Sequence, residues 1–241
     1  MDAPEHFPYE KISTNLQKSG LSEAEHRAFR AVDFVVTEKI HGANFCIHRG
    51  PQGIHFAKRK ALLTPEDDFF GYGHLREQLK ATIKRLHAEL AEYPAIAVYG
   101  ELFGGAYPHR DVEADPRFTA VQSGVWYCPD LRFCAFDIAV TTSKGLRHYL
   151  PFDRFTERCE SVRLLYTPAL FRGRLGPALA FSHEFPTTLP KLFGLPPLPD
   201  NYAEGVVVKA AESRKLPGHD MPLRPVVKRK TKAFAEDLRY H

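Results

Sequence analysis

The sequence lacks the apolar segments of membrane-spanning and exported proteins. It contains no run of about 18 apolar residues, the length that a membrane-spanning helix needs. Its first residues, MDAPEHFPYEKIS, include acids and no apolar stretch, so we expect no signal peptide. We therefore expect a cytoplasmic protein that makes no contact with a membrane.

Several common active-site signatures are missing as well. The glycines form neither a P-loop nor a complete dinucleotide-binding fingerprint, and the patterns H-E-x-x-H and G-x-S-x-G do not occur. No two cysteines form a C-x-x-C pair, which argues against a cysteine-bound zinc ion. Without an export signal we expect inert, free thiols at the four cysteines, Cys46, Cys128, Cys134 and Cys159.

The composition is that of a folded protein with an uneven charge. Hydrophobic residues make up 44% of the 241 residues and charged residues 26%, which excludes wholesale disorder. The net charge of +4 is too small to indicate nucleic acid by itself. However, residues 206–241 hold nine Lys or Arg and four Asp or Glu, a net charge of +5, and the other 205 residues carry −1. Such a basic segment suits a ligand rich in phosphate.

The hydrophobic pattern predicts many strands and few helices. Leu75, Leu79, Ile83, Leu86 and Leu90 recur at helical spacing, and Pro94 ends that predicted helix. A turn at His41-Gly42 joins the first two predicted strands, and five prolines make residues 186–200 irregular. Because helices and strands do not alternate regularly, we expect an α+β fold of antiparallel sheets flanked by helices. The predicted strands are 33–40, 44–48, 54–58, 95–103, 131–140, 203–210 and 224–230, and the other predicted helices are 150–160 and 232–240.

Two charged residues stand in segments that the pattern predicts to be buried. Lys39 ends an apolar strand, where a lysine that loses its proton can act as a nucleophile. The alternative is a lysine whose long stem reaches out to solvent. Glu101 lies within the apolar run 95–103 and therefore needs a partner or a ligand hydroxyl. The alternative is an ordinary buried carboxylate paired with an arginine.

Two of the later strands carry further charged residues. Glu204 and Lys209 bracket three valines, and Lys228 and Lys230, two residues apart, point to the same face of a strand. Such a lysine pair can bind a phosphate, although lysines also protect the exposed edges of sheets. Taken together, the charged residues suit one chemistry, in which a lysine attacks the α-phosphate of a nucleotide while cations neutralise the phosphate oxygens.

Five segments resemble, in their order along the chain, the motifs of covalent nucleotidyltransferases. The histidine of the K-x-H-G motif, and the stretches GELFGGAYPH and VQSGVWYCPDLRFCAFDIAV, resemble the RNA ligase family of the second bacteriophage RNA ligase and the kinetoplastid RNA-editing ligases. The resemblance runs from about Val32 to Phe234. It implies a single nucleotidyltransferase (ATP-grasp-like) domain over residues 1–241, with no C-terminal accessory domain. The segments are Lys39-Ile40-His41-Gly42, residues 99–105, Phe136-Asp137-Ile138, residues 204–209 and Lys228-Arg229-Lys230.

The resemblance also implies a role for each site residue. Lys39 would be the adenylated nucleophile, His41 would assist near the departing pyrophosphate, and Glu204 would hold Mg²⁺ through water. Phe136 would stack on adenine. Lys228 and Lys230 would contact the α-phosphate, and the backbone around Glu38 and Ile40 would read the base. The remaining nucleotide-binding residues would be Asn44, Arg59, Glu101, Asp137 and Lys209.

The implied activity is ATP-dependent sealing of RNA breaks. AMP would pass from ATP to the lysine, then to an RNA 5′-phosphate, and a 3′-hydroxyl would displace it, with Mg²⁺ or Mn²⁺ as the metal. Three alternatives stay open: a related nucleotidyltransferase that acts on DNA or another end, a catalytic subunit that needs a protein partner for the missing C-terminal surface, and a non-catalytic RNA-binding subunit.

Overall fold

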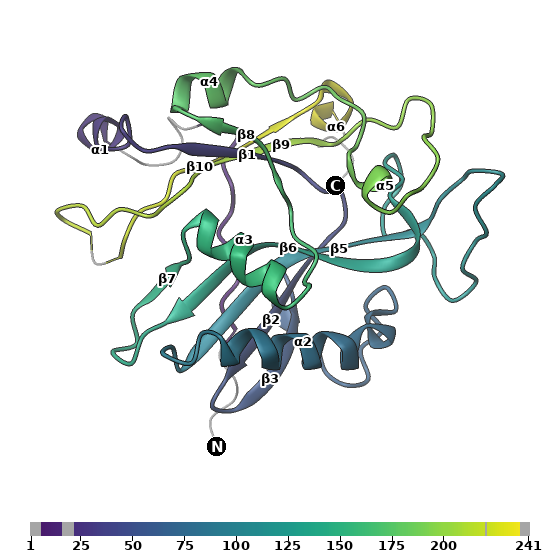
Figure 1. Cartoon of the computed structure of the whole chain (residues 1–241), viewed down its shortest axis with the longest axis horizontal. Coiled ribbons are helices and arrows are strands. Elements are labelled where there is room, and N and C mark those ends of the chain that lie inside the picture. Colours follow the sequence, from purple (N-terminus) through teal and green to yellow (C-terminus); the bar gives the residue numbers. More distant parts are fainter. Residues whose placement is uncertain (1–5, 16–21, 220, 237–241) are drawn as a thin grey trace.

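Two antiparallel β-sheets form the body of the protein, with helices packed against them (Figure 1). The structure is a computed structural model that describes residues 6–15, 22–219 and 221–236. The smaller sheet has the strand order β10-β9-β1-β8, and the larger has the order β4-β3-β2-β5-β6-β7. All of these neighbouring strands pair antiparallel, which confirms the α+β architecture that the sequence predicts.

The four-stranded sheet has alternating faces. Val206, Val208 and Val227 pack on one face into a core that also includes Phe34 and Val36. Their neighbours Val207, Lys209 and Lys228 point to the opposite face, toward the larger sheet, because successive side chains of a strand alternate. The strands of this sheet are β10 (Val226–Lys230), β9 (Gly205–Ala210), β1 (Phe34–Glu38) and β8 (Ala169–Gly173).

The six-stranded sheet carries the largest core. Phe45, Val98 and Ile138 belong to this core, as do Ile83 of helix α2 and Phe155 of helix α3. The spacing-based prediction of α2 is confirmed, but the helix ends at Ala88, six residues before Pro94. The strands are β4 (Ala61–Leu62), β3 (Gly53–Lys58), β2 (Ala43–Gly50), β5 (Ala95–Ala106), β6 (Cys128–Thr141) and β7 (Arg147–Tyr149). The helices are α2 (Arg76–Ala88) and α3 (Phe152–Ser161).

The short helices lie mainly around the smaller sheet and the connecting loops. Helix α4 contacts β1 and β8, and α6 follows β10. The predicted helix 232–240 is confirmed over 232–236, and its last residues lie outside the described part of the chain. The predicted irregular segment 186–200 contains one turn of helix, α5. The bounds are α1 (Glu23–Ala28), α4 (Leu175–Ala180), α5 (Leu189–Leu192), α6 (Lys232–Glu236) and a 3₁₀ helix at Tyr72–His74.

The turn at His41-Gly42 connects the two sheets. The sequence predicts a turn between two strands, and the structure shows that these strands, β1 and β2, belong to different sheets. A side chain at Gly42 would have no room, because a Cβ there would lie 2.1 Å from the carbonyl oxygen of Leu102. Glycine therefore allows the backbone to cross closely past β5.

A β-bulge in β6 alters the direction of Phe136. Tyr99 of β5 pairs with Asp137 and the next residue, Gly100, pairs with Ala135, so Phe136 is left without a partner. An extra residue of this kind redirects the side chains around it. As a result the consecutive residues Phe136 and Asp137 both line the space between the sheets.

Residues 6–15 form a strap that contacts both sheets. The backbone carbonyl of Phe7 accepts a hydrogen bond from Tyr99 of the larger sheet at 2.9 Å. The carbonyl of Ser13 accepts one from the Lys228 backbone N–H of the smaller sheet, also at 2.9 Å. All four cysteines are buried free thiols, as predicted. Among the described residues, no helix has both the length and the apolar character needed to cross a membrane.

Candidate functional site

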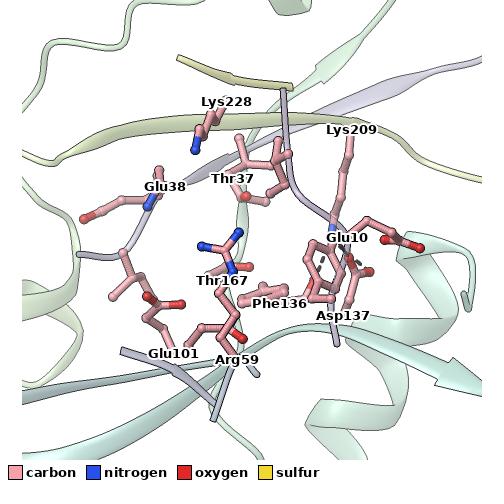
Figure 2. Close-up of a pocket in the computed structure, with 16 residues that line it drawn as sticks. Glu10, Thr37, Glu38, Arg59, Glu101, Phe136, Asp137, Thr167, Lys209 and Lys228 are labelled. Atoms are coloured by element: carbon pink, nitrogen blue, oxygen red, sulfur yellow. Dashed lines mark hydrogen bonds and ion pairs between the residues drawn. The ribbon is translucent and has the colours of Figure 1, made fainter. Parts of the chain in front are cut away.

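A cavity of about 820 Å³, counted with its solvent-open mouth, lies between the two sheets. Figure 2 shows Thr37, Lys209 and Lys228 of the smaller sheet on one side of this interior cavity, and Glu101, Phe136 and Asp137 of the larger sheet on the other. Ten of the thirteen residues that the sequence predicts for the site line it: Glu38, Lys39, Ile40, Asn44, Arg59, Glu101, Phe136, Asp137, Lys209 and Lys228. The other three, His41, Glu204 and Lys230, line an adjoining groove.

Lys39 stands where the cavity and the groove meet. It follows β1 directly, and its backbone N–H donates to the carbonyl of Gly205 at 2.9 Å, which fixes the end of the strand. Its side chain is 21% exposed and lines both spaces. The Nζ atom lies 2.6 Å from Oε2 of Glu204. A lysine amine therefore faces the cavity and the groove from the end of a hydrogen-bonded strand.

Glu204 contacts three of the basic residues of the groove, Lys39, His41 and Lys230. Its side chain is 2% exposed, and its Oε1 lies 2.7 Å from Nζ of Lys230. The Nδ1 atom of His41 lies 3.4 Å from Oε2, the oxygen that also contacts Lys39. Burial alone would raise the pKa of Glu204, but the hydrogen bond from His41 and the charges of Lys39 and Lys230 outweigh burial and lower the pKa to about 2. The carboxylate is therefore ionised at neutral pH.

Lys228 and Lys230 line the same groove, as the alternation predicts. Burial lowers the pKa of Lys228, and the neighbouring charges of Lys39 and Lys230 lower it further. The side chains of Lys39, Lys228 and Lys230 therefore form a site that favours the binding of an anion. Lys58, Arg59 and Lys60 extend the positive charge of the groove, which we call the cationic groove.

Glu101 faces the same space from β5. Removal from water raises the pKa of Glu101 to about 7, with a further increase from Glu204 that Lys39 and Arg59 oppose. Asn44 on β2 pairs in register with Glu101, so both side chains lie where β2 and β5 border the cavity. The carboxyl and the amide can therefore both contact a polar group of a ligand.

A buried charge network supports the Phe136 side of the cavity. Two nitrogens of Arg224 lie 2.7 Å from the two oxygens of Asp137, and the Tyr9 hydroxyl donates to Asp137 Oδ2 at 2.6 Å. Lys209 Nζ lies 3.2 Å from Asp137 Oδ1 and donates to the Phe136 carbonyl at 2.5 Å. The side chains of Lys209 and Asp137 thus fix the bulge that carries Phe136, although both residues also line the cavity.

Charge pairing keeps this network ionised in spite of its burial. Burial raises the pKa of Asp137, but the charges of Arg224 and Lys209 outweigh burial and lower the pKa to about 2. Burial lowers the pKa of Lys209 to about 8, although Asp137 opposes the change. A buried ion pair of this kind is strongly sensitive to loss of one partner.

The Glu38 side chain is used for structure. One oxygen accepts a hydrogen bond from the Thr187 hydroxyl, and the other accepts from the Thr188 backbone N–H at 2.8 Å and from its hydroxyl at 2.6 Å. Burial raises the pKa of Glu38 against the effect of these hydrogen bonds. The Glu38 carboxylate therefore holds Thr187 and Thr188 against the end of β1. The use of the backbone around Glu38 and Ile40 to read a base stays a prediction.

Sequence reasoning missed several residues of the site. The strap supplies Tyr9, Glu10 and Ile12 to the cavity, and Thr167 lies beside Phe136. Arg224 reaches Asp137 from 87 residues away. None of these residues stands in a recognisable motif. Only the fold brings them to the site.

The acidic residues suit a metal ion held through water. Among residues 6–15, 22–219 and 221–236, no cluster of three or more His, Cys, Asp or Glu side chains is arranged to hold a metal directly. Both oxygens of Glu204 already contact lysines. Mg²⁺ commonly keeps several of its waters, so this arrangement fits contact through water.

Comparisons with known proteins agree with this geometry. A sequence profile described as RNA ligase matches residues 32–230. The mitochondrial RNA-editing ligase 2 of Trypanosoma brucei brucei is 37% identical over 228 residues, which cover 85% of this chain and 55% of the relative. Mitochondrial RNA-editing ligase 1 of the same organism is 36% identical over 234 residues, which cover 84% of this chain and 48% of the relative. The chain spans about half the length of these relatives.

A solved structure shares the fold at low sequence identity. A lysine-to-methionine mutant of Naegleria gruberi RNA ligase with AMP and Mn superposes with a TM-score of 0.62 and 16% identity. The match covers 97% of this chain and 59% of that protein. At such low identity the likeness shows a common nucleotidyltransferase fold.

Proposed function

The chain belongs to the RNA ligase family, and from this membership and the geometry of the cavity we propose that it is an ATP-dependent RNA ligase that forms a covalent lysyl-AMP intermediate. The observation that carries the proposal is the position of Lys39, whose side chain lines both the interior cavity beside Phe136 and the cationic groove. One adenylyltransferase domain would contain all of the predicted site residues.

In the first step Lys39 Nζ attacks the α-phosphorus of ATP. The Lys39 ammonium group loses one proton before the attack and a second after it, both to solvent, so that the new nitrogen–phosphorus bond is that of a phosphoramidate with one N–H. The bond from the α-phosphorus to the bridging oxygen breaks, and pyrophosphate leaves. Lys228 and Lys230 stabilise the charge on the phosphate oxygens, and His41 lies beside the path of the leaving group. Phe136 stacks on the base while Glu101 and Asn44 contact the ribose.

In the next steps the AMP group moves to RNA. A phosphate oxygen at the RNA 5′ end attacks the lysyl-AMP phosphorus and frees the amine, and the adjacent 3′-hydroxyl then attacks the RNA 5′-phosphorus and releases AMP. Each step is a displacement at phosphorus, so positioning and charge neutralisation supply most of the rate. The cationic groove is the side from which RNA would approach Lys39.

A divalent cation fits beside Glu204. Glu204 would hold Mg²⁺ or Mn²⁺ through water, and the bound cation would neutralise phosphate charge. The Naegleria ligase structure with AMP and Mn supports this choice of nucleotide and metal. A cytoplasmic location stays a prediction from the sequence, since the names of both trypanosomal relatives assign those proteins to mitochondria.

Covalent labelling tests the first step. After incubation with α-labelled ATP and Mg²⁺, a denaturing gel is expected to show labelled protein for the wild type and none for Lys39→Ala. Lys191→Ala, which removes an exposed lysine of α5, is the matched control and should label normally. Labelling of Lys39→Ala at the wild-type level would contradict the proposal.

Nick sealing tests the substrate and the need for a partner. We expect the chain to seal a nicked all-RNA duplex faster than a duplex whose 3′-hydroxyl strand is DNA, because the 2′-hydroxyl distinguishes the two. Equal sealing of both would argue against RNA as the substrate class. Labelling without sealing would support a catalytic subunit that needs a protein partner.

A further inference from the structure

Thr167 carries a buried hydroxyl group that has no hydrogen-bond partner among the described residues. The residue is 3% exposed. Its Oγ1 is the one hydroxyl among the buried side-chain polar atoms without a partner in the described part of the chain, and the others are Nε atoms of arginines. Native proteins rarely keep an unpaired buried hydroxyl, because the loss of hydration is not compensated. This hydroxyl therefore needs a partner that the folded chain does not supply.

The backbone of Thr167 is fixed beside the base of the bulge in β6. Its N–H donates to the Ala135 carbonyl at 2.9 Å, next to Phe136. Two residues later the chain enters β8, where Ala169 pairs with Thr37 of β1. Thr167 therefore lies where the chain passes from one sheet to the other, and Figure 2 shows it lining the interior cavity with Thr37 and Phe136.

The side chain of Thr167 can offer its hydroxyl to the cavity without repacking. Rotation about χ1 exchanges the hydroxyl and the methyl group within nearly the same volume. A hydroxyl both donates and accepts, so it can pair with either an amino group or a ring nitrogen. The backbone hydrogen bond keeps the rotation axis in place while the side chain turns.

The position of Thr167 indicates which part of a nucleotide it meets. Of the lysines that suit phosphates, Lys230 lines the cationic groove and Lys228 lines both the groove and the cavity, whereas Thr167 lines the cavity and not the groove. Thr167 lies instead beside Phe136, the aromatic ring available for stacking. A base stacked on that ring would present its polar edge to the surrounding wall, where Thr167 stands.

We propose that the Thr167 hydroxyl forms a hydrogen bond with the edge of the adenine base and so helps to determine which nucleotide the cavity accepts. The proposal rests on the proposed function, because it assumes that the cavity binds ATP. A site that pairs a buried hydroxyl with a ligand group discriminates against ligands that lack the group, since the hydroxyl is then left unpaired. Thr167 thus acts by direct contact with the base.

Equilibrium binding of ATP to the whole chain, measured by calorimetry without a divalent cation, tests the contact. Thr167→Val keeps the shape and removes the hydroxyl, and we expect it to weaken ATP binding about three- to tenfold. Thr167→Ser keeps the hydroxyl and should bind within about twofold of the wild type. Thr82→Val is the matched control, because Thr82 is a buried threonine of α2 whose hydroxyl accepts from Arg85. It should bind ATP as the wild type does.

ATP analogues identify the contacted atom. The probes are 1-deaza-, 3-deaza- and 7-deaza-ATP and the analogue without the 6-amino group. We expect one of them to bind the wild type about as weakly as ATP binds Thr167→Val, and to lose no further affinity in that variant. The proposal is overturned if Thr167→Val binds ATP like the wild type, or if the variant weakens all four analogues as much as it weakens ATP.

The two proposals fail in different ways. If the wild type binds ATP but does not become labelled at Lys39, the ligase proposal fails, and the calorimetric comparison of Thr167→Val with the wild type still decides the base contact. If labelling occurs and Thr167→Val binds ATP normally, the base contact fails and the ligase proposal stands. Absence of ATP binding by the wild type contradicts both.

Discussion

At the scale of single residues, two carboxyl groups of the site have opposite electrostatic environments. Glu204 contacts Lys39 and Lys230, and its pKa is about 2. Glu101 lies nearby without an ion pair among the described residues, and its removal from water raises its pKa to about 7. The protein therefore keeps one carboxylate ionised at all physiological pH values, and near pH 7 it leaves the other divided between its two forms.

The raised pKa of Glu101 predicts a pH-dependent affinity for ATP. If ionised Glu101 accepts hydrogen bonds from the ribose hydroxyls, ATP should bind up to about tenfold more tightly at pH 8 than at pH 6, since the ionised fraction rises across this range. The side chain of the Glu101→Gln variant does not ionise in this range, so the ATP affinity of this variant should lack that part of the pH dependence. Calorimetry at several pH values, without divalent cation, measures the affinity of both proteins for ATP. A wild-type pH profile identical to that of Glu101→Gln would contradict the prediction.

The raised pKa of Glu101 also determines the direction in which folding stability changes with pH. The folded-state pKa of Glu101 exceeds the ordinary value of 4.5, so the folded chain holds this proton more tightly than the unfolded chain does. The contribution of Glu101 to stability is therefore fully present below pH 4.5 and is lost as the pH rises to about 7. Glu204, whose pKa is lowered, shows the opposite sign, since its contribution is present above pH 4.5 and is lost as the pH falls to about 2.

The sequence reveals those site residues whose charge conflicts with an apolar pattern. Lys39 and Glu101 stand out because each interrupts or ends a run of buried residues, and both line the cavity. Arg224 and Thr167 do not stand out, since an arginine at the start of a predicted strand and a threonine before a proline conflict with no local pattern. Their importance depends on contacts across the fold, which a local pattern does not encode.

At the scale of elements, the connection from β1 to β2 positions the nucleophile. Lys39 is held by the Gly205 carbonyl, and the His41 backbone N–H donates to the Tyr127 hydroxyl at 2.8 Å. Gly42 then passes against the carbonyl of Leu102. Contacts with β9, with Tyr127 and with β5 thus hold three of the four residues of this connection, so the loop has little freedom to adjust.

Gly42→Ala is expected to reduce formation of lysyl-AMP at least about tenfold. The added Cβ would lie 2.1 Å from the Leu102 carbonyl oxygen and 2.8 Å from Glu101 Cγ, so the backbone that carries Lys39 must shift. Displacement of a reacting group by about 1 Å can lower a rate by about 100-fold. The measurement is the rate of covalent labelling, with circular dichroism to verify that the variant folds.

The control for this substitution is Gly73→Ala. A Cβ at Gly73, in the 3₁₀ helix, would meet no atom within 4 Å, so labelling should stay at the wild-type rate. A folded Gly42→Ala variant that labels as fast as Gly73→Ala would show that the close approach to β5 is unimportant.

The strands and helices of the core are easier to predict from the sequence than the short elements at the periphery of the fold. All seven predicted strands and the helix at α2 are present, because long apolar runs and helical spacing are strong local signals. The prediction omits several short elements that are only partly apolar, namely α1, β4, β7, β8 and α4. The bulge at Phe136 is also invisible in the sequence, since it depends on the register between β5 and β6.

At the scale of the whole molecule, positive charge gathers around one opening. The basic character of residues 206–241 is used in part by the cationic groove, to which β10 contributes Lys228 and Lys230. The end of β3 and the turn after it add Lys58, Arg59 and Lys60, which lie far away in the sequence. The groove is therefore more basic than the net charge of +4 suggests.

RNA binding is expected to weaken steeply with salt. For Lys39→Ala without ATP, binding of a nicked RNA duplex should fall between about 50 and 200 mM salt because phosphate contacts release counterions. The double substitution Lys58→Ala and Lys60→Ala should reduce the log–log slope by about 1 to 2. Filter binding at several salt concentrations measures the slope. Lys144→Ala, in the turn between β6 and β7, serves as the control. A double variant with the slope of this control would exclude the groove from RNA binding.

The strap of residues 6–15 has a consequence for the motions of the molecule. Because its backbone is hydrogen-bonded to Tyr99 of one sheet and to Lys228 of the other, the sheets cannot separate unless the strap detaches from one of them. Widening of the cavity is therefore expected to be coupled to release of the strap. A nucleotide that contacts both sheets would link them a second time. Bound nucleotide is therefore expected to slow the separation of the two sheets.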